Sequence, residues 1–330
     1  MRKRLLVILG ITMGVLVLCV LSGLTGFKER QTIPKEMQKR EYGTWFWTSL
    51  FKVTPEYRDT VLRTAQENGI TSIYVAIDPY IYIMRLTDEE DRKRYTELFS
   101  TSLEEFIRHA HTYGIVVDAV AGQPNWVEDR NSDMYRIAVE YVKTFNETHE
   151  VKLRGLQFDI EPYVLDLYQE NKKSILVRYL DIIKDTTEIL KDTDIEFSVA
   201  IPEFYDGKSA GSPQFFFDWH YGYTFEHLIH ILKNKPNSKI LVMAYRTKSL
   251  GDDGTIDIAK DEIFQANRSH VQIIVAQEVG DVESSHISFY GMSKEYYKEQ
   301  LSIIDDVFGG EKSYAGKAVH YIDALRELKD

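Results

Sequence analysis

Two alternating patterns of apolar residues run along the chain from residue 43 to its end. Short runs rich in Val, Ile, Tyr and Phe are typical of buried parallel strands, and the segments between them carry apolar residues at the three- and four-residue spacing of amphipathic helices. The predicted strands are 43–48, 72–77, 115–121, 153–161, 195–201, 240–245, 271–277 and 317–321. The predicted helices are 55–69, 102–114, 133–149, 173–192, 224–234, 256–267, 293–308 and 323–329.

Capping residues mark several helix starts. Thr54 precedes a proline in the first turn of its helix, and Ser293 precedes another apolar-periodic segment. Ser102 and Glu105 match the capping-box pattern S-x-x-E, which predicts a helix that starts at Ser102 and stops at Gly114.

Eight strand–helix repeats over about 290 residues are the number and length of a (β/α)8 TIM barrel of the α/β class. An open, doubly wound sheet is the alternative. That fold usually has a glycine-rich turn after its first strand, whereas the stretch 48–57 here, TSLFKVTPEY, contains no glycine. The sequence therefore favours the barrel, with its active site at the C-terminal ends of the strands.

The first 27 residues indicate a membrane segment. Residues 5–27 contain no charge and follow Arg2, Lys3 and Arg4. A bilayer core needs roughly 20 apolar residues, whereas the apolar core of a cleaved signal is about 7–15 residues long. We expect 1–27 to be a transmembrane helix or uncleaved signal, 28–42 a stalk linker and 43–330 the barrel domain.

This arrangement also predicts a location. The positive-inside rule puts the N-terminus in the cytoplasm and the barrel outside, as a single-pass protein of the cell membrane. If the leader is cleaved instead, the barrel is secreted.

The charge distribution separates the leader from the barrel. Residues 1–42 hold eight Lys/Arg and three Glu, a net charge of +5, and the rest of the chain holds 32 positive and 48 negative charges, a net charge of −16. Such an acidic body disfavours a general nucleic-acid binder. A single Cys excludes an intramolecular disulfide and a Cys-based zinc or iron–sulfur site. The pairs His109/His111 and His227/His230 lack acidic ligands at zinc spacing, so we expect them on helix surfaces or at helix C-termini, where they complement the dipole, and predict neither metal nor cofactor.

The fourth predicted strand carries the strongest chemical signal. Its side chains alternate, so the apolar set faces the helices while Gln157, Asp159 and Glu161 face the barrel interior. Two inward carboxylates two residues apart repel each other, which raises the pKa of one of them. We expect that acid to be Glu161. The alternative is a structural ion pair with an inward Arg or Lys.

Two motifs resemble the family 18 glycoside hydrolases, which include chitinases and endo-N-acetylglucosaminidases. That family carries D-x-x-D-x-D-x-E on its fourth strand, and this chain has R-x-x-Q-x-D-x-E from Arg154 to Glu161. The family also carries M-x-Y-D on its sixth strand, and this chain has Met243-Ala244-Tyr245-Arg246. The chain thus looks like a divergent member that keeps half of each motif.

The resemblance implies roles for the matching residues. Glu161 would protonate the glycosidic oxygen, Asp159 would orient a substrate N-acetyl group whose carbonyl serves as internal nucleophile, and Tyr245 would hydrogen-bond the same group. The substrate would be an amino-sugar-containing glycan. The chain departs from the family at Arg154 and Gln157, where the family has the acids that support Asp159.

Glu278, at the end of the seventh predicted strand, suggests a different partner for Glu161. Many retaining glycosidases on this fold place the acid/base on strand four and a nucleophilic carboxylate on strand seven. A separation of about 5–5.5 Å between the two carboxyl groups would imply a covalent intermediate. The alternative for Glu278 is a solvated loop carboxylate.

Other strand ends are rich in residue types that bind sugars. Aromatic rings stack on sugar faces, and polar side chains bond hydroxyls, although core packing explains any single aromatic residue equally well. Trp126 and Trp219, near loop starts, are the strongest aromatic candidates. The full set of predicted substrate-binding residues is Trp45, Trp47, Asp78, Gln123, Asn125, Trp126, Gln157, Glu203, Trp219, Arg246 and His320.

The sequence therefore predicts a membrane-anchored O-glycosyl hydrolase of the cell surface whose partner is a glycan. The alternative is a non-catalytic glycan-binding barrel that descends from such an enzyme. A deacetylase is a third option, which the lack of a metal triad in the sequence disfavours.

The division into leader and barrel is testable by truncation. A chain that begins near Glu41 should be soluble and unfold cooperatively on heating, because its net charge stays near −16. Thermal unfolding followed by circular dichroism measures this. Aggregation of the shortened chain would count against the division.

Overall fold

A computed structural model describes residues 40–207 and 212–329 of the chain. The predicted transmembrane segment 5–27 and residues 28–39 of the predicted stalk lie outside these residues. Within them, the helices are all too short or too polar to cross a membrane.

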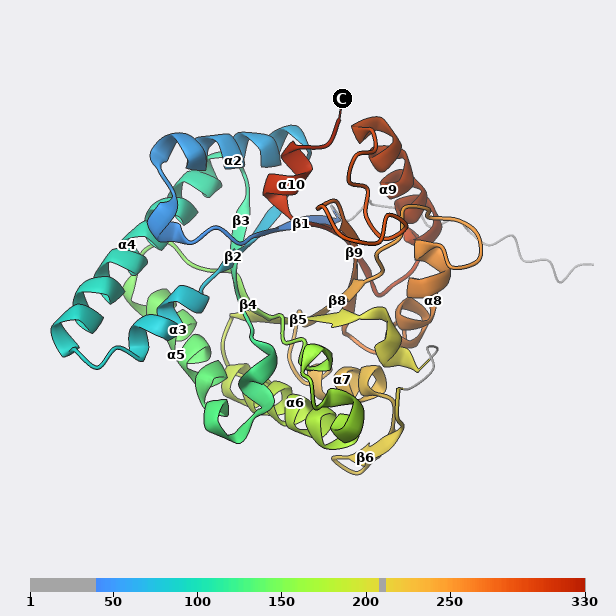
Figure 1. Cartoon of the computed structure of the whole chain (residues 1–330), viewed down its shortest axis with the longest axis horizontal. Helices are drawn as coiled ribbons and strands as arrows, with labels where there is room; N and C mark the ends of the chain where they lie inside the picture. The colour runs from blue at the N-terminus through green and yellow to red at the C-terminus, as the bar shows by residue number, and fades with distance from the viewer. Residues whose placement is uncertain (1–39, 208–211, 330) are drawn as a thin grey trace, which may run out of the picture. The chain divides into compact units, whose positions relative to one another are not determined.

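Eight parallel strands close into a barrel, which Figure 1 shows end-on. The last strand returns to the first, with Glu41 paired in register to Gly316. This confirms the predicted fold and all eight predicted strands, the first of which begins at Glu41 rather than at Gly43. The strands are β1 (Glu41–Phe46), β2 (Ser72–Ala76), β3 (Val116–Ala121), β4 (Gly155–Phe158), β5 (Glu196–Pro202), β8 (Lys239–Met243), β9 (Gln272–Glu278) and β10 (Tyr314–His320).

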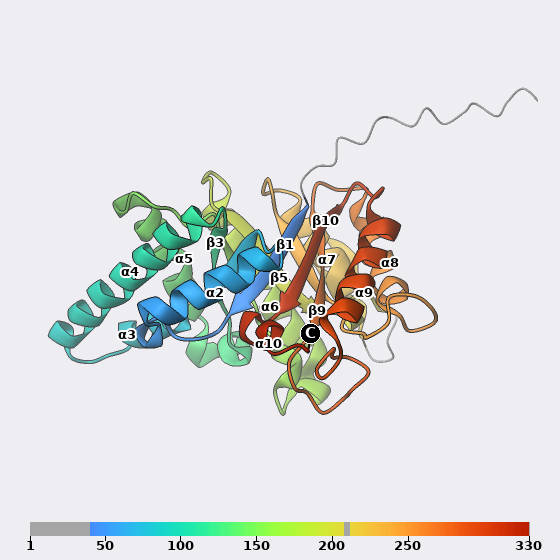
Figure 2. The same ribbon diagram turned by 90° about the horizontal axis from the view of Figure 1, so that it is seen from above.

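Helices surround the barrel on all sides (Figures 1 and 2). They are α2 (Pro55–Glu67), α4 (Glu89–Thr112), α5 (Met134–Thr148), α6 (Tyr168–Leu190), α7 (Thr224–Leu232), α8 (Thr255–Ala266), α9 (Lys294–Phe308) and α10 (Ile322–Arg326). Two elements were not predicted: the short helix α3 (Asp78–Met84) after β2, and an antiparallel hairpin of β6 (Phe215–Phe217) and β7 (His220–Gly222) before α7.

The predicted start of α4 is wrong, whereas two other predicted caps are confirmed. Thr54 and Ser293 accept hydrogen bonds from backbone N–H groups three residues ahead, each at 3.2 Å. The helix around Ser102 instead begins at Glu89, where Asp88 is the cap, and Ser102 lies within it. The first turns of this helix are almost wholly charged, so they lack the apolar stripe from which we inferred helices.

An apolar layer fills the middle of the barrel. Trp45, Tyr74, Leu241 and Ile274 are buried there, and the rings of Trp45 and Tyr74 lie 5.3 Å apart. This layer separates the two ends of the interior, where polar side chains gather.

A network of ion pairs closes the N-terminal end of the barrel. Arg154 contacts Glu41 at 2.7 Å and also pairs with Asp118, while Lys239 lies 3.1 Å from Glu41 and also pairs with Glu196. Burial alone would raise the pKa of Glu41, but the two cations outweigh it and lower the pKa to about 2. Arg154 therefore pairs with acids at the N-terminal end of the barrel, which we call the floor, and not with Asp159 or Glu161.

The floor network predicts a stability effect. Glu41→Gln leaves Arg154 and Lys239 without their shared anion, so the free energy of unfolding at pH 7 should fall by about 3 kcal/mol. Because folding lowers this pKa, the contribution of Glu41 is present above the usual pKa of a glutamate and is lost as the pH falls through about 2.

Urea denaturation of both proteins measures the difference. Asp129→Asn is the control, since it breaks a pair with Arg178 in which the Asp129 side chain is 89% exposed, and it should cost less than about 1 kcal/mol. A Glu41→Gln protein as stable as the control variant would contradict a structural role for the floor.

Candidate active site at the C-terminal end of the barrel

The predicted catalytic residues lie at one rim because parallel strands end together. Asp159 and Glu161 follow β4, Tyr245 follows β8 by two residues, and Glu278 is the last residue of β9. The register of β9 and β10 places Glu278 directly beside His320.

A close backbone contact sets the position of Asp159. Its N–H donates to the carbonyl of Ala121 at 3.0 Å, which continues the pairing of β3 and β4 past the end of β4. A Cβ atom on Gly122 would lie 2.1 Å from the carbonyl oxygen of Asp159, so a side chain at residue 122 would push the two strand ends apart.

The environment of Asp159 shifts the pKa of its carboxyl group close to neutral pH. Burial raises the pKa of Asp159 to about 7, and the nearby Glu161 carboxylate adds to the shift. Its Oδ1 atom is buried and has no hydrogen-bond partner among the described residues. Of the two acids that were predicted to repel each other, Asp159 therefore bears a raised pKa.

Glu161 and Tyr245 complete the centre of the site. The hydroxyl of Tyr163 donates a hydrogen bond to Glu161 Oε1. Tyr245 is half-buried, and the pKa of its phenol is raised by desolvation and by the carboxylates of Glu278, Asp159 and Glu161. Tyr245 thus lies within electrostatic reach of all three acids.

Glu278 is a buried residue rather than a solvated loop carboxylate, with only 4% of its surface exposed. The N–H of Gly280 donates to its Oε1 at 2.6 Å, and His320 Nδ1 lies 2.7 Å from its Oε2. Trp47 Nε1 in turn donates to His320 Nε2 at 2.9 Å.

Several predicted substrate-binding residues lie at or just below this rim. Gln123 donates to Asp78 Oδ1 at 3.2 Å, and Asp78 is close enough to Asp159 to contribute to its raised pKa. One layer down, Trp45 donates to Gln157 Oε1 at 2.6 Å. Trp45 and Gln157 are both fully buried, so they support the site from below.

The two favoured aromatic candidates lie elsewhere. Trp126 is 2% exposed and packs edge-on against Phe158 in the outer core. Trp219 is fully exposed at the tip of the β6–β7 hairpin. The residue before it, Asp218, pairs at 2.7 Å with Lys184 of α6, so the hairpin tip packs on the outer wall.

Three further predicted residues belong to the loops around the site. Asn125 is exposed after β3. Arg246 donates to Asp253 Oδ1 at 2.8 Å and lies 3.9 Å from Glu203. These contacts hold the loops that follow β5 and β8 together, and Arg246 does not pair with the four central residues.

Tyr163 is a site residue that the sequence analysis missed. Pro162 starts a short 3-10 helix (Pro162–Val164) immediately after Glu161, and this turn brings the phenol back to the Glu161 carboxylate. The Glu-Pro-Tyr sequence is the signal that could have indicated it. The predicted helix-surface position of His227 is also wrong, because the β6–β7 hairpin buries that ring.

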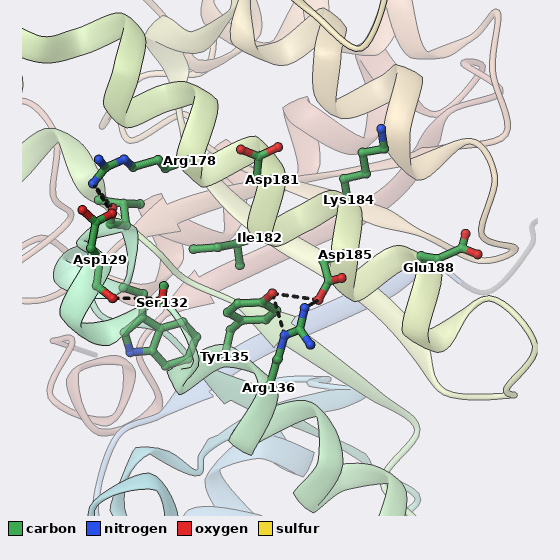
Figure 3. A pocket seen from close by; sticks show the side chains of 12 residues that line it. Asp129, Ser132, Tyr135, Arg136, Arg178, Asp181, Ile182, Lys184, Asp185 and Glu188 are labelled. Atoms are coloured by element: carbon green, nitrogen blue, oxygen red, sulfur yellow. Dashed lines mark hydrogen bonds and ion pairs between the residues drawn. The ribbon is translucent and has the colours of Figure 1, made fainter.

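A separate groove of about 560 Å³ lies on the outer wall, between α5 and α6 (Figure 3). Its charged side chains are largely paired with one another: Arg136 lies 2.9 Å from Asp185, to which Tyr135 donates at 2.7 Å. None of the four central residues lines this groove. Within 40–207 and 212–329, no group of three His, Cys, Asp or Glu side chains is placed to hold a metal ion.

Comparison with known proteins identifies the fold. No family model and no curated protein sequence matches the chain. Among solved structures, a GH18 chitinase from Pseudoalteromonas aurantia is similar with a TM-score of 0.51 and 13% identity, over 87% of this chain and 99% of that one.

Two other solved structures are similar to the same degree. An endo-1,4-β-D-mannanase from Thermotoga petrophila RKU-1 has a TM-score of 0.54 and 11% identity, over 86% of this chain and 88% of that one. β-Glucosidase 2 from Trichoderma reesei has a TM-score of 0.52 and 9% identity, over 85% and 88%. The chain therefore has the TIM-barrel fold that these glycoside hydrolases share.

Because folding raises the pKa of Asp159, we expect this carboxyl group to lower the free energy of unfolding at neutral and alkaline pH. The folded protein retains a proton up to about pH 7, whereas the unfolded chain releases it near pH 4, so the folded state is penalised increasingly between these values and fully above pH 7. Asp159→Asn should raise the free energy of unfolding at pH 8 by about 4 kcal/mol and change it little at pH 4.

Urea denaturation at the two pH values tests this expectation. Asp166→Asn, at an exposed position of the loop after β4, is the matched control and should have no effect at either pH. An Asp159→Asn protein that is no more stable than wild type at pH 8 would show that this carboxyl is not held protonated.

Proposed function

We propose that the protein is a retaining glycoside hydrolase that acts on amino-sugar-containing glycans. The observation that carries the proposal is that Asp159, Glu161 and Glu278 all lie within electrostatic reach of the half-buried Tyr245 phenol. Carboxyl pairs at the C-terminal rim of a barrel are the usual apparatus of glycosidic bond cleavage. The glycosidases among the similar structures support the reaction class through the fold alone.

Glu161 is the proposed general acid. It follows β4 at the rim, where a bound glycan would reach it, and the Tyr163 hydroxyl holds one of its oxygens. In the reaction, Glu161 gives its proton to the glycosidic oxygen as the bond from that oxygen to the anomeric carbon breaks. It then accepts a proton from the attacking water in the second step.

Glu278 is the proposed nucleophile. The Gly280 N–H and the His320 ring hold its two oxygens and stabilise negative charge on them. One of these oxygens forms a bond to the anomeric carbon as the leaving group departs, and water later breaks that bond with retention of configuration. This covalent route is favoured over the substrate-assisted one because Arg154 and Gln157 are engaged with Glu41 and Trp45, away from Asp159.

Asp159 and Tyr245 are the proposed contacts for the 2-substituent of the sugar. A protonated Asp159 carboxyl and the Tyr245 phenol are both neutral donors, which suit an amide oxygen of an N-acetyl group. The amino-sugar preference follows from the kept Asp-x-Glu and Met-x-Tyr patterns. With the predicted anchor, the substrate is a cell-wall or surface polysaccharide outside the membrane.

The proposal predicts a specific defect for Glu161→Gln. The substitution keeps the shape of the side chain and removes the transferable proton, so hydrolysis of an unactivated glycan should fall by about 10²–10⁴-fold while glycan binding persists. A substrate with a good leaving group needs less protonation and should lose less. Initial rates on both kinds of substrate measure the contrast.

Glu283→Gln, at an exposed loop position, is the matched control and should leave the rates unchanged. Undiminished turnover of a natural glycan by Glu161→Gln would exclude that residue as the acid. A wild-type protein that binds glycans but hydrolyses none across a broad panel would favour the non-catalytic glycan-binding barrel.

A further inference from the structure

The His320 ring lies between a hydrogen-bond donor, the indole of Trp47, and a carboxyl group, that of Glu278. Its Nε2 lies 2.9 Å from Trp47 Nε1, and its Nδ1 lies 2.7 Å from Glu278 Oε2. The three side chains come from the ends of β1, β10 and β9, which are neighbours in the barrel. The ring is therefore held by strands rather than by loops.

The indole of Trp47 determines which nitrogen of His320 carries the proton. An indole N–H can only donate, so His320 Nε2 must accept and has no proton of its own. In a neutral ring the proton is then on Nδ1, from where it points at the Glu278 carboxylate. This Nδ1–H form is the less common tautomer of free histidine, so the site selects it.

We propose that His320 is a positioning residue that Trp47 holds as the neutral Nδ1–H tautomer and that fixes Glu278 for its reaction. The inference rests on the proposed function of Glu278 as nucleophile. Together, Gly280 and His320 engage both oxygens of Glu278 from two different segments, so the carboxylate cannot rotate about its terminal bond without losing one of them.

The same arrangement bears on the protonation of Asp159. A second proton on His320 would have to displace the Trp47 N–H, because both would compete for Nε2. The titratable groups that face the ring are Glu278, Tyr245, Tyr321 and Asp159. A positive charge on His320 would lower the pKa of Asp159, so a neutral ring favours the protonated form of that carboxyl.

Two substitutions separate the role of Nδ1 from that of the ring as a whole. The amide nitrogen of Asn can occupy the place of His Nδ1, whereas that of Gln falls near Nε2. His320→Asn should therefore keep a donor on Glu278 and retain most of kcat. His320→Gln should lose about 10²-fold in kcat with little change in KM, because the nucleophile is misplaced rather than the substrate unbound.

A spectroscopic measurement tests the tautomer without any substrate. In wild-type protein with ¹⁵N-labelled histidine, the His320 ring should show a protonated Nδ1 and an unprotonated Nε2 at pH 8. The resonances are assigned by their loss in His320→Asn, and His270→Asn, at an exposed position, is the matched control. Trp47→Phe removes the indole donor and should increase the doubly protonated ring at each pH below neutrality.

The outcomes distinguish this inference from the proposed function. A His320 ring with an unprotonated Nδ1, or equal losses of kcat in the Asn and Gln variants, would overturn it. If the nitrogen spectra show the Nδ1–H tautomer and the Trp47 dependence but no glycan is hydrolysed, the geometry of His320 is supported and the proposed glycosidase function fails.

Discussion

The separation of charge along the barrel axis is the constraint on which the site depends. Arg154 and Lys239 are both committed to Glu41 and its neighbours at the floor, and an apolar layer around Trp45 and Tyr74 lies above them. Among the ion pairs of the described residues, no Lys or Arg is paired with Asp159 or Glu161. Asp159 and Glu161 therefore have no Lys or Arg partner in this part of the chain to offset desolvation and their mutual repulsion, which together raise the pKa of Asp159.

The three acids at the rim have different surroundings. Asp159 has a buried oxygen without a partner among the described residues and stays protonated to about pH 7, whereas Glu278 contacts a backbone N–H and an imidazole. Glu161 accepts a hydrogen bond from the hydroxyl of Tyr163. A site of this kind has a proton donor and a stabilised anion at the same time, which is what two-carboxylate glycoside cleavage requires.

Local sequence patterns were sufficient to predict the strands and the inward face of β4, because both depend on alternation within a few residues. They were insufficient wherever a partner is distant in the chain. The partner of Arg154 is Glu41, 113 residues earlier, so the sequence could not distinguish a floor residue from a lost catalytic acid. The tautomer of His320 likewise depends on Trp47, 273 residues away.

Burial explains the other differences between prediction and structure. Trp126 and Trp219 have the same residue type and similar positions near loop starts, but one packs under β4 and the other projects from the outer wall. Asp159 and Glu161 follow β4 two residues apart, and desolvation is the largest cause of the raised pKa of Asp159. Neither depth nor packing is encoded in residue spacing.

The stereochemistry of the first product tests the central claim most directly. Proton NMR spectra recorded during hydrolysis of a β-linked amino-sugar oligosaccharide reveal the anomer that is released before mutarotation. A retaining site built on Glu161 and Glu278 should release the β-anomer first. Release of the α-anomer would contradict the account, because inversion requires a water molecule, not Glu278, to attack the anomeric carbon.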